Sequence, residues 1–119
     1  MTLQEQIKAT RENEKATGKG YLVYRVFENG NLIYVGLGGK GKRPGSGRLA
    51  EHNSTSSFSS FRHQYYITQW KNGSSYDEAT AMWNQLEWDA IHCDSVATME
   101  RMEDSIIKAA NPPYNRSQK

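Results

Sequence analysis

The chain has 119 residues, of which 36% are hydrophobic, and a formal net charge of +2. This length fits one domain, and no apolar run approaches the roughly 20 residues that a membrane-spanning helix needs. Residues 1–20 lack the apolar centre of a secretory signal. The lone Cys93 excludes an internal disulfide and a cysteine-rich zinc site, so a reducing cytoplasm is the expected compartment.

Positive charge is concentrated in residues 18–48. This segment holds six lysines and arginines against one acid, a local net charge of +5, and the remaining residues sum to −3. Clustered positive charge is typical of a phosphate-binding face. Taken alone, the charge fits a solvated basic loop equally well.

Residues 2–16 are predicted to form the first helix. Thr2 and Glu5 have the spacing of a capping box. Only three residues of the segment could face a core, so the helix is expected to be loosely attached or partly frayed. We therefore take residues 1–19 as an arm and residues 20–116 as the domain.

Two runs rich in β-branched and aromatic residues, YLVYRVF and NLIYVG, predict a β-hairpin. A two-residue turn would put Tyr24 and Tyr34 on opposite faces, whereas a three-residue loop with a left-handed Gly30 would pair them directly. We expect the longer loop, because it places both tyrosines together opposite a continuous apolar face. The two expected faces are Val23, Phe27, Ile33 and Val35 on one side, and Leu22, Tyr24, Val26, Leu32 and Tyr34 on the other.

The rest of the chain alternates between turn signals and periodic segments. Residues 36–47 contain six glycines among twelve residues, which predicts an irregular loop. Proline at 112 and 113 ends the last helix, because proline cannot continue one. The other predicted elements are a short helix at 48–52, a helix at 58–71 with Phe58, Phe61, Tyr65 and Trp70 toward the core, a helix from Ser75 to about Leu86 opened by a capping box, a strand at 87–93, and a helix from Asp94 or Ser95 to about Ala110.

Three groups of residues stand out along the chain. Tyr24 ends the tripeptide Leu-Val-Tyr, and ten residues later Tyr34 begins Tyr-Val-Gly. Arg48 and His52 lie four residues apart, which puts both on one face of a helix. Each group has a common structural explanation when taken alone, as packing aromatics or as surface side chains.

The third group is at the C-terminal end of the chain. Glu103 is followed three and four residues later by two isoleucines, and twelve residues later by Asn115 in the sequence Pro-Tyr-Asn. In order and spacing, the three groups resemble the motifs of the GIY-YIG nuclease family. The resemblance covers the chain from about residue 21 to residue 115.

The resemblance implies an α/β (α+β) domain in which helices flank a three-stranded antiparallel sheet and the motif residues converge on one surface. It also implies metal-dependent hydrolysis of DNA phosphodiester bonds. Glu103 would be the single protein ligand of Mg²⁺ or Mn²⁺, a hard ion that keeps most of its waters. A site with one such ligand is expected to nick one strand at a time.

The resemblance assigns roles to the other motif residues. One tyrosine would be the base, Tyr34 by preference with Tyr24 hydrogen-bonded beside it. A phenol needs nearby positive charge for this role, since its reference pKa is about 10. Arg48 would bind the phosphate, and His52 would contact phosphate or assist proton transfer. Asn115 would hold the loops of the site by hydrogen bonds.

One position departs from the family pattern. Many members have a lysine directly after the glycine of the second tripeptide, where this chain has Leu37. Lys40 or Lys42 could fold back to replace it, and the neighbouring glycines would let backbone N–H groups approach phosphate. We expect these lysines, Arg43 and Arg25 to contact the DNA backbone.

Two other functions stay open on the sequence: a non-catalytic nucleic-acid-binding module and a protein-interaction domain with the same fold. The missing lysine favours the first, and retention of the other motif residues opposes it. Binding that weakens steeply with salt would indicate phosphate contacts rather than a protein partner. Specificity is expected to come from loops, DNA structure, a homodimer or a partner protein, and the substrate could be branched DNA, RNA or a restriction site.

Overall fold

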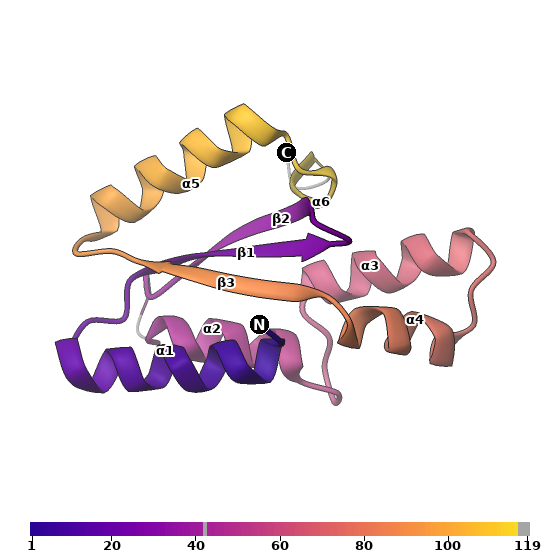
Figure 1. The fold of residues 1–119 in the computed structure, drawn as a ribbon, viewed down its shortest axis with the longest axis horizontal. Coiled ribbons are helices and arrows are strands. Elements are labelled where there is room, and N and C mark those ends of the chain that lie inside the picture. Colours follow the sequence, from indigo (N-terminus) through magenta and orange to yellow (C-terminus); the bar gives the residue numbers. More distant parts are fainter. Residues whose placement is uncertain (42, 117–119) are drawn as a thin grey trace.

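The computed structural model describes residues 1–41 and 43–116 of the chain. Strands β1 (Leu22–Glu28), β2 (Asn31–Gly38) and β3 (Glu87–His92) form an antiparallel sheet in the order β2-β1-β3. Helix α5 (Val96–Ala110) covers one face of the sheet, and helices α1 to α4 lie on the other side (Figure 1). The predicted α+β domain is thereby confirmed. The other helices are α1 (Leu3–Thr17), α2 (Gly45–Asn53), α3 (Ser60–Lys71), α4 (Tyr76–Asn84) and α6 (Pro113–Arg116).

Helix α1 is packed along one face, unlike the loosely attached arm expected from its polar composition. Leu3 and Ile7 belong to the core on the α2 side of the sheet. Gln6 and Thr10 complete the buried stripe, and the Gln6 amide donates a 3.0 Å hydrogen bond to the Thr10 hydroxyl. A polar pair that satisfies itself can be buried at little cost, so hydrophobicity alone understates how firmly α1 is attached.

The β1–β2 hairpin has a two-residue turn, so the expected three-residue loop is wrong. Asn29 and Gly30 both have positive φ, at 51° and 80°, and Glu28 lies directly opposite Asn31. Asparagine tolerates the left-handed region better than most residues, and two such residues in succession suit the twist of a hairpin.

A β-bulge places both motif tyrosines on one face in spite of the short turn. Phe27 lies opposite Leu32, but Val26 lies opposite Tyr34, so the register shifts by one residue on β2. The extra residue, Ile33, reverses which face every later side chain of β2 occupies. The shared face of the tyrosines was therefore predicted, whereas the direct pairing was not: Tyr24 lies opposite Gly36.

The bulge also exchanges two residues between the faces of the sheet. Ile33 packs with the two tyrosines, and Leu32 packs against Val23 and Val35 under α5. Each of these two residues was expected on the opposite face, because a three-residue loop needs no bulge. The rest of both expected faces keeps its assignment, apart from Phe27, which belongs to neither buried cluster.

The glycine-rich segment is more regular than expected. Strand β2 continues to Gly38, and α2 begins at Gly45, three residues earlier than predicted. A Cβ atom on Gly45 would lie 2.2 Å from Leu22 Cδ2. Glycine at this position therefore lets the start of α2 press directly against β1, which fixes where the helix leaves the sheet.

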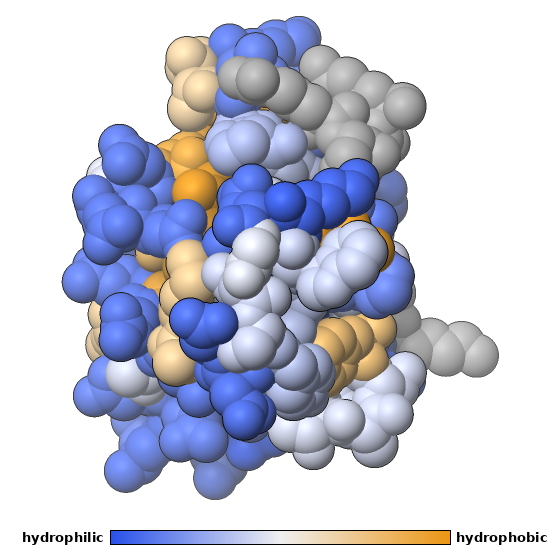
Figure 2. Space-filling view, turned by 90° about the vertical axis from the view of Figure 1, so that its right-hand side faces the viewer, coloured by the Kyte–Doolittle hydropathy of each residue, from blue (hydrophilic) through white to orange (hydrophobic). Residues whose placement is uncertain are grey.

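The predicted third strand, final helix and capping box at Ser75 are confirmed. Trp70 differs from its prediction, because its side chain is 71% exposed. The buried stripe of α3 runs through Phe61, Tyr65 and Gln69, so Trp70 lies about 100° around the helix from it. At this end of the molecule hydrophilic residues predominate, and apolar residues occupy small separate areas (Figure 2). No helix in the described part of the chain is both long and apolar enough to span a membrane.

Candidate active site

Four motif residues meet on the α2 side of the sheet. The ring centroids of Tyr24 and Tyr34 are 6.2 Å apart, and His52 from α2 lies 5.3 Å from the first and 6.2 Å from the second. Arg48, one turn before His52, interacts with both tyrosines through its charge. The i, i+4 spacing that the sequence displays thus brings arginine and histidine to one cluster. We call Tyr24, Tyr34, Arg48 and His52 the tyrosine cluster.

A chain of hydrogen bonds runs through His52. Its Nε2 lies 2.6 Å from the Tyr24 hydroxyl oxygen, and its Nδ1 lies 2.6 Å from the Ser59 hydroxyl oxygen. Burial, together with the charges of Arg48 and Arg62, lowers the pKa of His52 from 6.5 to about 3. The imidazole is therefore neutral at physiological pH and carries one N–H group.

The proton positions follow from this neutrality. Burial raises the pKa of Tyr24 well above its usual value, with Tyr34 adding to the effect and Arg48 opposing it, so its hydroxyl stays protonated. The protonated Tyr24 hydroxyl therefore donates to Nε2 of the neutral His52 ring. The Nδ1–H then donates to Ser59, the N-cap residue of α3.

The burial of His52 sets its role. The imidazole is 0% exposed, so in this structure it does not face a phosphate in solvent, as the resemblance allowed. It orients the Tyr24 hydroxyl instead. Ser59, which orients His52 in turn, was missed in the sequence, where it is one of five serines in residues 54–60 and nothing distinguishes it.

Acid is expected to destabilise the fold through His52. The unfolded chain binds a proton near pH 6.5 and the folded chain only near pH 3, so stability falls as the pH drops through this window. At about 1.4 kcal/mol per pKa unit, the loss is on the order of 4 kcal/mol. Urea unfolding from pH 7 to pH 4 would measure it. His52→Gln should flatten the slope, and replacing the exposed His63 by glutamine should not; equal slopes in all three chains would contradict this assignment.

The absence of a side chain at Gly36 leaves room for the ring of Tyr24. A Cβ atom at this position would lie 2.2 Å from Tyr24 Cζ and 2.3 Å from its hydroxyl oxygen. Because the ring is fully buried, it cannot move aside freely. The glycine of the second motif tripeptide is therefore required by the tyrosine of the first.

Gly36→Ala is expected to destabilise the fold by about 3 kcal/mol, the upper part of the usual range for overpacking a core. Thermal and urea unfolding would measure the loss. Gly41→Ala is the matched control, because no atom lies within 4 Å of its added Cβ. Equal stability of the Gly36 and Gly41 variants would show that the tyrosine is less tightly held than the structure indicates.

A cavity of about 250 Å³ opens where β2 ends and α2 begins. Arg48 and Arg43 bind separate oxygens of Glu51 there, each at 2.5 Å. With Lys40, the cavity has three cations against one acid, which suits a phosphate. Arg48 thus connects the buried tyrosines to an open, positively charged surface. The lining residues are Leu37, Gly38, Gly39, Lys40, Gly41, Arg43, Pro44, Arg48 and Glu51.

Lysine 40 links this cavity to α5 on the other face of the sheet. Its Nζ lies 3.3 Å from a carboxylate oxygen of Glu100, and its charge also acts on Glu103. Lys42, the other lysine considered as a replacement at Leu37, lies outside the described residues.

Glu103 lies apart from the tyrosine cluster. It is on α5, across the sheet from the tyrosines (Figure 1), and makes no hydrogen bond or ion pair with any described residue. Burial raises the pKa of Glu103; Lys40 opposes the rise, and Glu100 and Asp104 add to it. The expected convergence of all motif residues on one surface is thus only partly seen, because α5 and α2 lie on opposite faces of the sheet (Figure 1).

The donor chemistry at Glu103 fits a hard divalent cation. A half-buried carboxylate with a raised pKa gains when a cation compensates its charge, and Mg²⁺ accepts one carboxylate with several waters. Within residues 1–41 and 43–116, no group of three or more His, Cys, Asp or Glu side chains could hold a metal. Any cation here would therefore have few protein ligands.

Asn115 and Arg25 have different surroundings. The Asn115 Oδ1 accepts from the Val35 N–H at 2.9 Å, and its Nδ2 donates to the Val35 carbonyl at 2.8 Å. The amide thus takes the place of a neighbouring strand at the edge of the sheet, next to Tyr34. Arg25 instead binds Asp89 on β3 at 2.9 and 2.5 Å. It does not share the cavity with Arg43 and Lys40.

No family model and no curated protein matches the chain. Among solved structures, it is similar to the GIY-YIG N-terminal endonuclease domain of UvrC from Thermotoga maritima, a point mutant bound to its catalytic divalent cation. The two share 17% sequence identity, with a TM-score of 0.47 over 90% of this chain and 94% of the other.

Proposed function

We propose that this chain is a GIY-YIG endonuclease that hydrolyses DNA phosphodiester bonds with Mg²⁺ or Mn²⁺. The observation that carries the proposal is that Arg48 lies between the tyrosine cluster and the open cavity. The same guanidinium acts through its charge on two buried tyrosines and lines an open cationic cavity with Lys40 and Arg43. Phosphoryl transfer needs such a group, which both binds the phosphate and stabilises developing charge.

DNA would enter through the cavity at the end of β2. Lys40 and Arg43 attract the backbone, and the fork of Arg48 takes two phosphate oxygens. The small side chains of Gly38, Gly39 and Gly41 let phosphate approach the main chain. We assign Lys40 to the place of the lysine missing at position 37.

Tyr34 is the better candidate for the residue that accepts a proton from the attacking water. It keeps a small exposed surface, 4%, whereas Tyr24 has none. Tyr24 stays protonated and hydrogen-bonded to His52. We therefore assign Tyr34 the base role and Tyr24 a positioning role.

Glu103 would hold the cation on the α5 side of the same strand end. A bound divalent ion supplies charge stabilisation at the scissile phosphate and the leaving oxygen. Lys40, which lies between Glu100 and the cavity, would complete the cationic surface from Arg48 to α5. One such site per chain favours nicking over cutting of both strands.

One observation favours the alternative of a non-catalytic DNA-binding module. Leu37 occupies the lysine position, and Lys40 is already paired with Glu100. Such a module would bind DNA with a steep salt dependence and would leave a supercoiled plasmid intact in every metal.

The test is nicking of supercoiled plasmid by the purified full chain with Mg²⁺, with Mn²⁺ and with EDTA. We expect open-circular product only with metal, and loss of activity on heating at the temperature where the circular dichroism signal melts. Activity that survives that melting belongs to a contaminant. Salt-sensitive DNA binding without any nicking would establish the binding module instead.

A further inference from the structure

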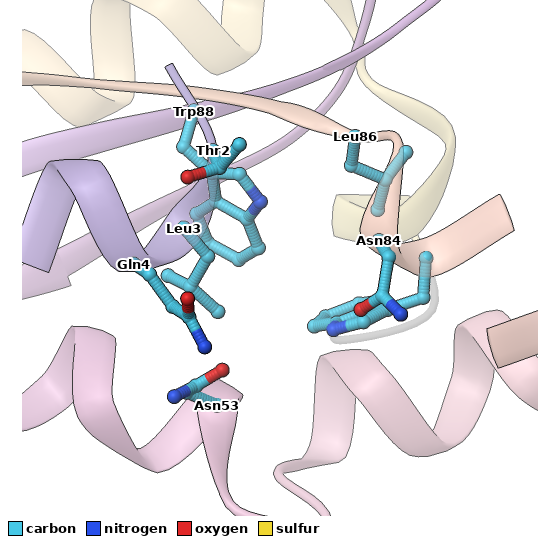
Figure 3. A pocket seen from close by; sticks show the side chains of 8 residues that line it. Thr2, Leu3, Gln4, Asn53, Asn84, Leu86 and Trp88 are labelled. Carbon is cyan, nitrogen blue, oxygen red and sulfur yellow. The ribbon is translucent and has the colours of Figure 1, made fainter. Parts of the chain in front are cut away.

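A second cavity, of about 300 Å³, lies beside the tyrosine cluster. It opens between the start of α1, the end of α2 and the turn that joins α4 to β3 (Figure 3). No charged side chain lines it, so it differs from the phosphate-binding cavity described above. The lining residues are Thr2, Leu3, Gln4, Asn53, Trp83, Asn84, Leu86 and Trp88.

The rim of this cavity is formed by three exposed carboxamides. Gln4 and Asn53 point toward each other on one side of the opening, and Asn84 lies across from them (Figure 3). None of the three side chains hydrogen-bonds to a described residue. Each offers two N–H donors and a carbonyl acceptor, so the rim can bind both donors and acceptors of a ligand.

Two indole rings form the floor. Trp83 and Trp88 are only 3% and 2% exposed, and their ring centroids lie 5.7 Å apart at 74°. Within the described chain, neither indole N–H has a hydrogen-bond acceptor. Neither indole nitrogen is among the fully buried polar atoms of the described chain that lack a partner, so both stay accessible and can donate to a ligand acceptor at the floor.

We infer that this cavity binds one nucleobase. An uncharged, planar heteroaromatic ring with donors and acceptors along its edge matches a carboxamide rim over an aromatic floor. Carboxamides pair with base edges in a bidentate manner, and an extruded base is held by edge hydrogen bonds and aromatic contact. The absence of cations from the lining disfavours a phosphate or a carboxylate as the group bound inside.

The cavity is connected to the tyrosine cluster through shared residues. Trp88 stacks on Tyr24 with ring centroids 6.1 Å apart and an interplanar angle of 26°, and it lies 5.6 Å from His52. Asn53 directly follows His52 on α2. A base in the cavity would thus lie against the far side of the residues that position Tyr24. The base comes from an unstacked nucleotide of DNA or from a free nucleoside; the DNA source alone rests on the proposed function.

The experiment has one arm for each source. Equilibrium dialysis of the full chain against each of the four natural deoxynucleosides tests the free source. A duplex with one central 2-aminopurine, whose fluorescence rises when the base unstacks, tests the DNA source on the Glu103→Gln chain, which is expected to leave the duplex uncut. Both arms use the double variant Asn53→Ala, Asn84→Ala. The matched control is Gln85→Ala, which changes the neighbouring exposed amide outside the lining.

We expect at least one deoxynucleoside to bind, and its affinity to fall about tenfold or more in the double variant and less than twofold in the control. A rise in 2-aminopurine fluorescence that the double variant loses would assign the base to DNA; nucleoside binding without that rise would assign it to a free nucleoside. Binding of neither probe, or equal binding by the double variant, would overturn the inference. Equal displacement by deoxyribose 5-phosphate would overturn the assignment to the base. If the chain binds a nucleoside but does not nick plasmid, the proposed function is wrong and the inference about the cavity stands.

Discussion

Glu103→Gln is expected to abolish metal-dependent nicking, with a loss of about a thousandfold or more. Glutamine keeps the size of this half-buried side chain but removes the negative charge that would hold a hard cation. A metal contributes several kcal/mol to charge stabilisation at a phosphoryl group, and about 4 kcal/mol corresponds to a thousandfold in rate. The measurement is the initial rate of open-circle formation at saturating Mg²⁺.

Asp104→Asn is the matched control for this prediction. Asp104 is the next residue on α5, is exposed, and forms a 2.8 Å ion pair with Lys108 one turn away. Its replacement removes the same charge from the same helix and should change the rate by less than threefold. Nicking that survives in the Glu103 variant, or is lost equally in the Asp104 variant, would show that the cation is held elsewhere.

The sequence pattern predicted the strands of the hairpin but not its turn or its bulge. Alternation of apolar and aromatic residues correctly predicted two paired strands with Tyr24 and Tyr34 on one face. The prediction assumed a three-residue loop, whereas the fold combines a two-residue turn with a bulge at Ile33. Both geometries place the two tyrosines on the same face of the sheet. Only the two-residue turn with a bulge puts Leu32 and Ile33 on the faces opposite to those expected. Packing on both faces of the sheet decides between the two geometries.

The sequence predicted which residues of the candidate site lie together better than it predicted how deeply they are buried. Helical spacing placed Arg48 and His52 on one face of α2. Whether that face is open or buried depends on α3 and on Trp88, which come from distant parts of the chain. His52 is consequently a neutral buried group rather than a ligand for phosphate.

The separation of Glu103 from the tyrosines likewise depends on tertiary structure. Motif order shows that these residues occur along one chain, but not that α5 packs on the opposite face of the sheet (Figure 1). The cavity at the end of β2 is lined by the strand end, the following loop and α2, and glycine at position 45 lets α2 start close to the sheet. The long side chain of Lys40, which follows β2, reaches Glu100 on α5 and so connects the two faces of the sheet.

The second large effect is expected for Arg48→Lys, which keeps the charge of the cavity but removes the planar fork. Lysine cannot donate to Glu51 and to a phosphate in one fixed plane. Loss of one preorganised electrostatic donor costs about a hundredfold to a thousandfold in turnover. We therefore expect plasmid nicking to fall by at least about a hundredfold, with little change in the salt dependence of DNA binding, because the charge is retained.

Arg43→Lys provides an internal comparison for this result. Arg43 binds the other oxygen of the same Glu51 carboxylate at the same distance and lines the same cavity, but its side chain is 71% exposed. Its replacement should reduce nicking by less than threefold. If both lysine variants lose activity equally, the cavity acts only as a basic surface that attracts DNA. A loss confined to Arg48 would place the reacting phosphate beside Tyr24 and Tyr34.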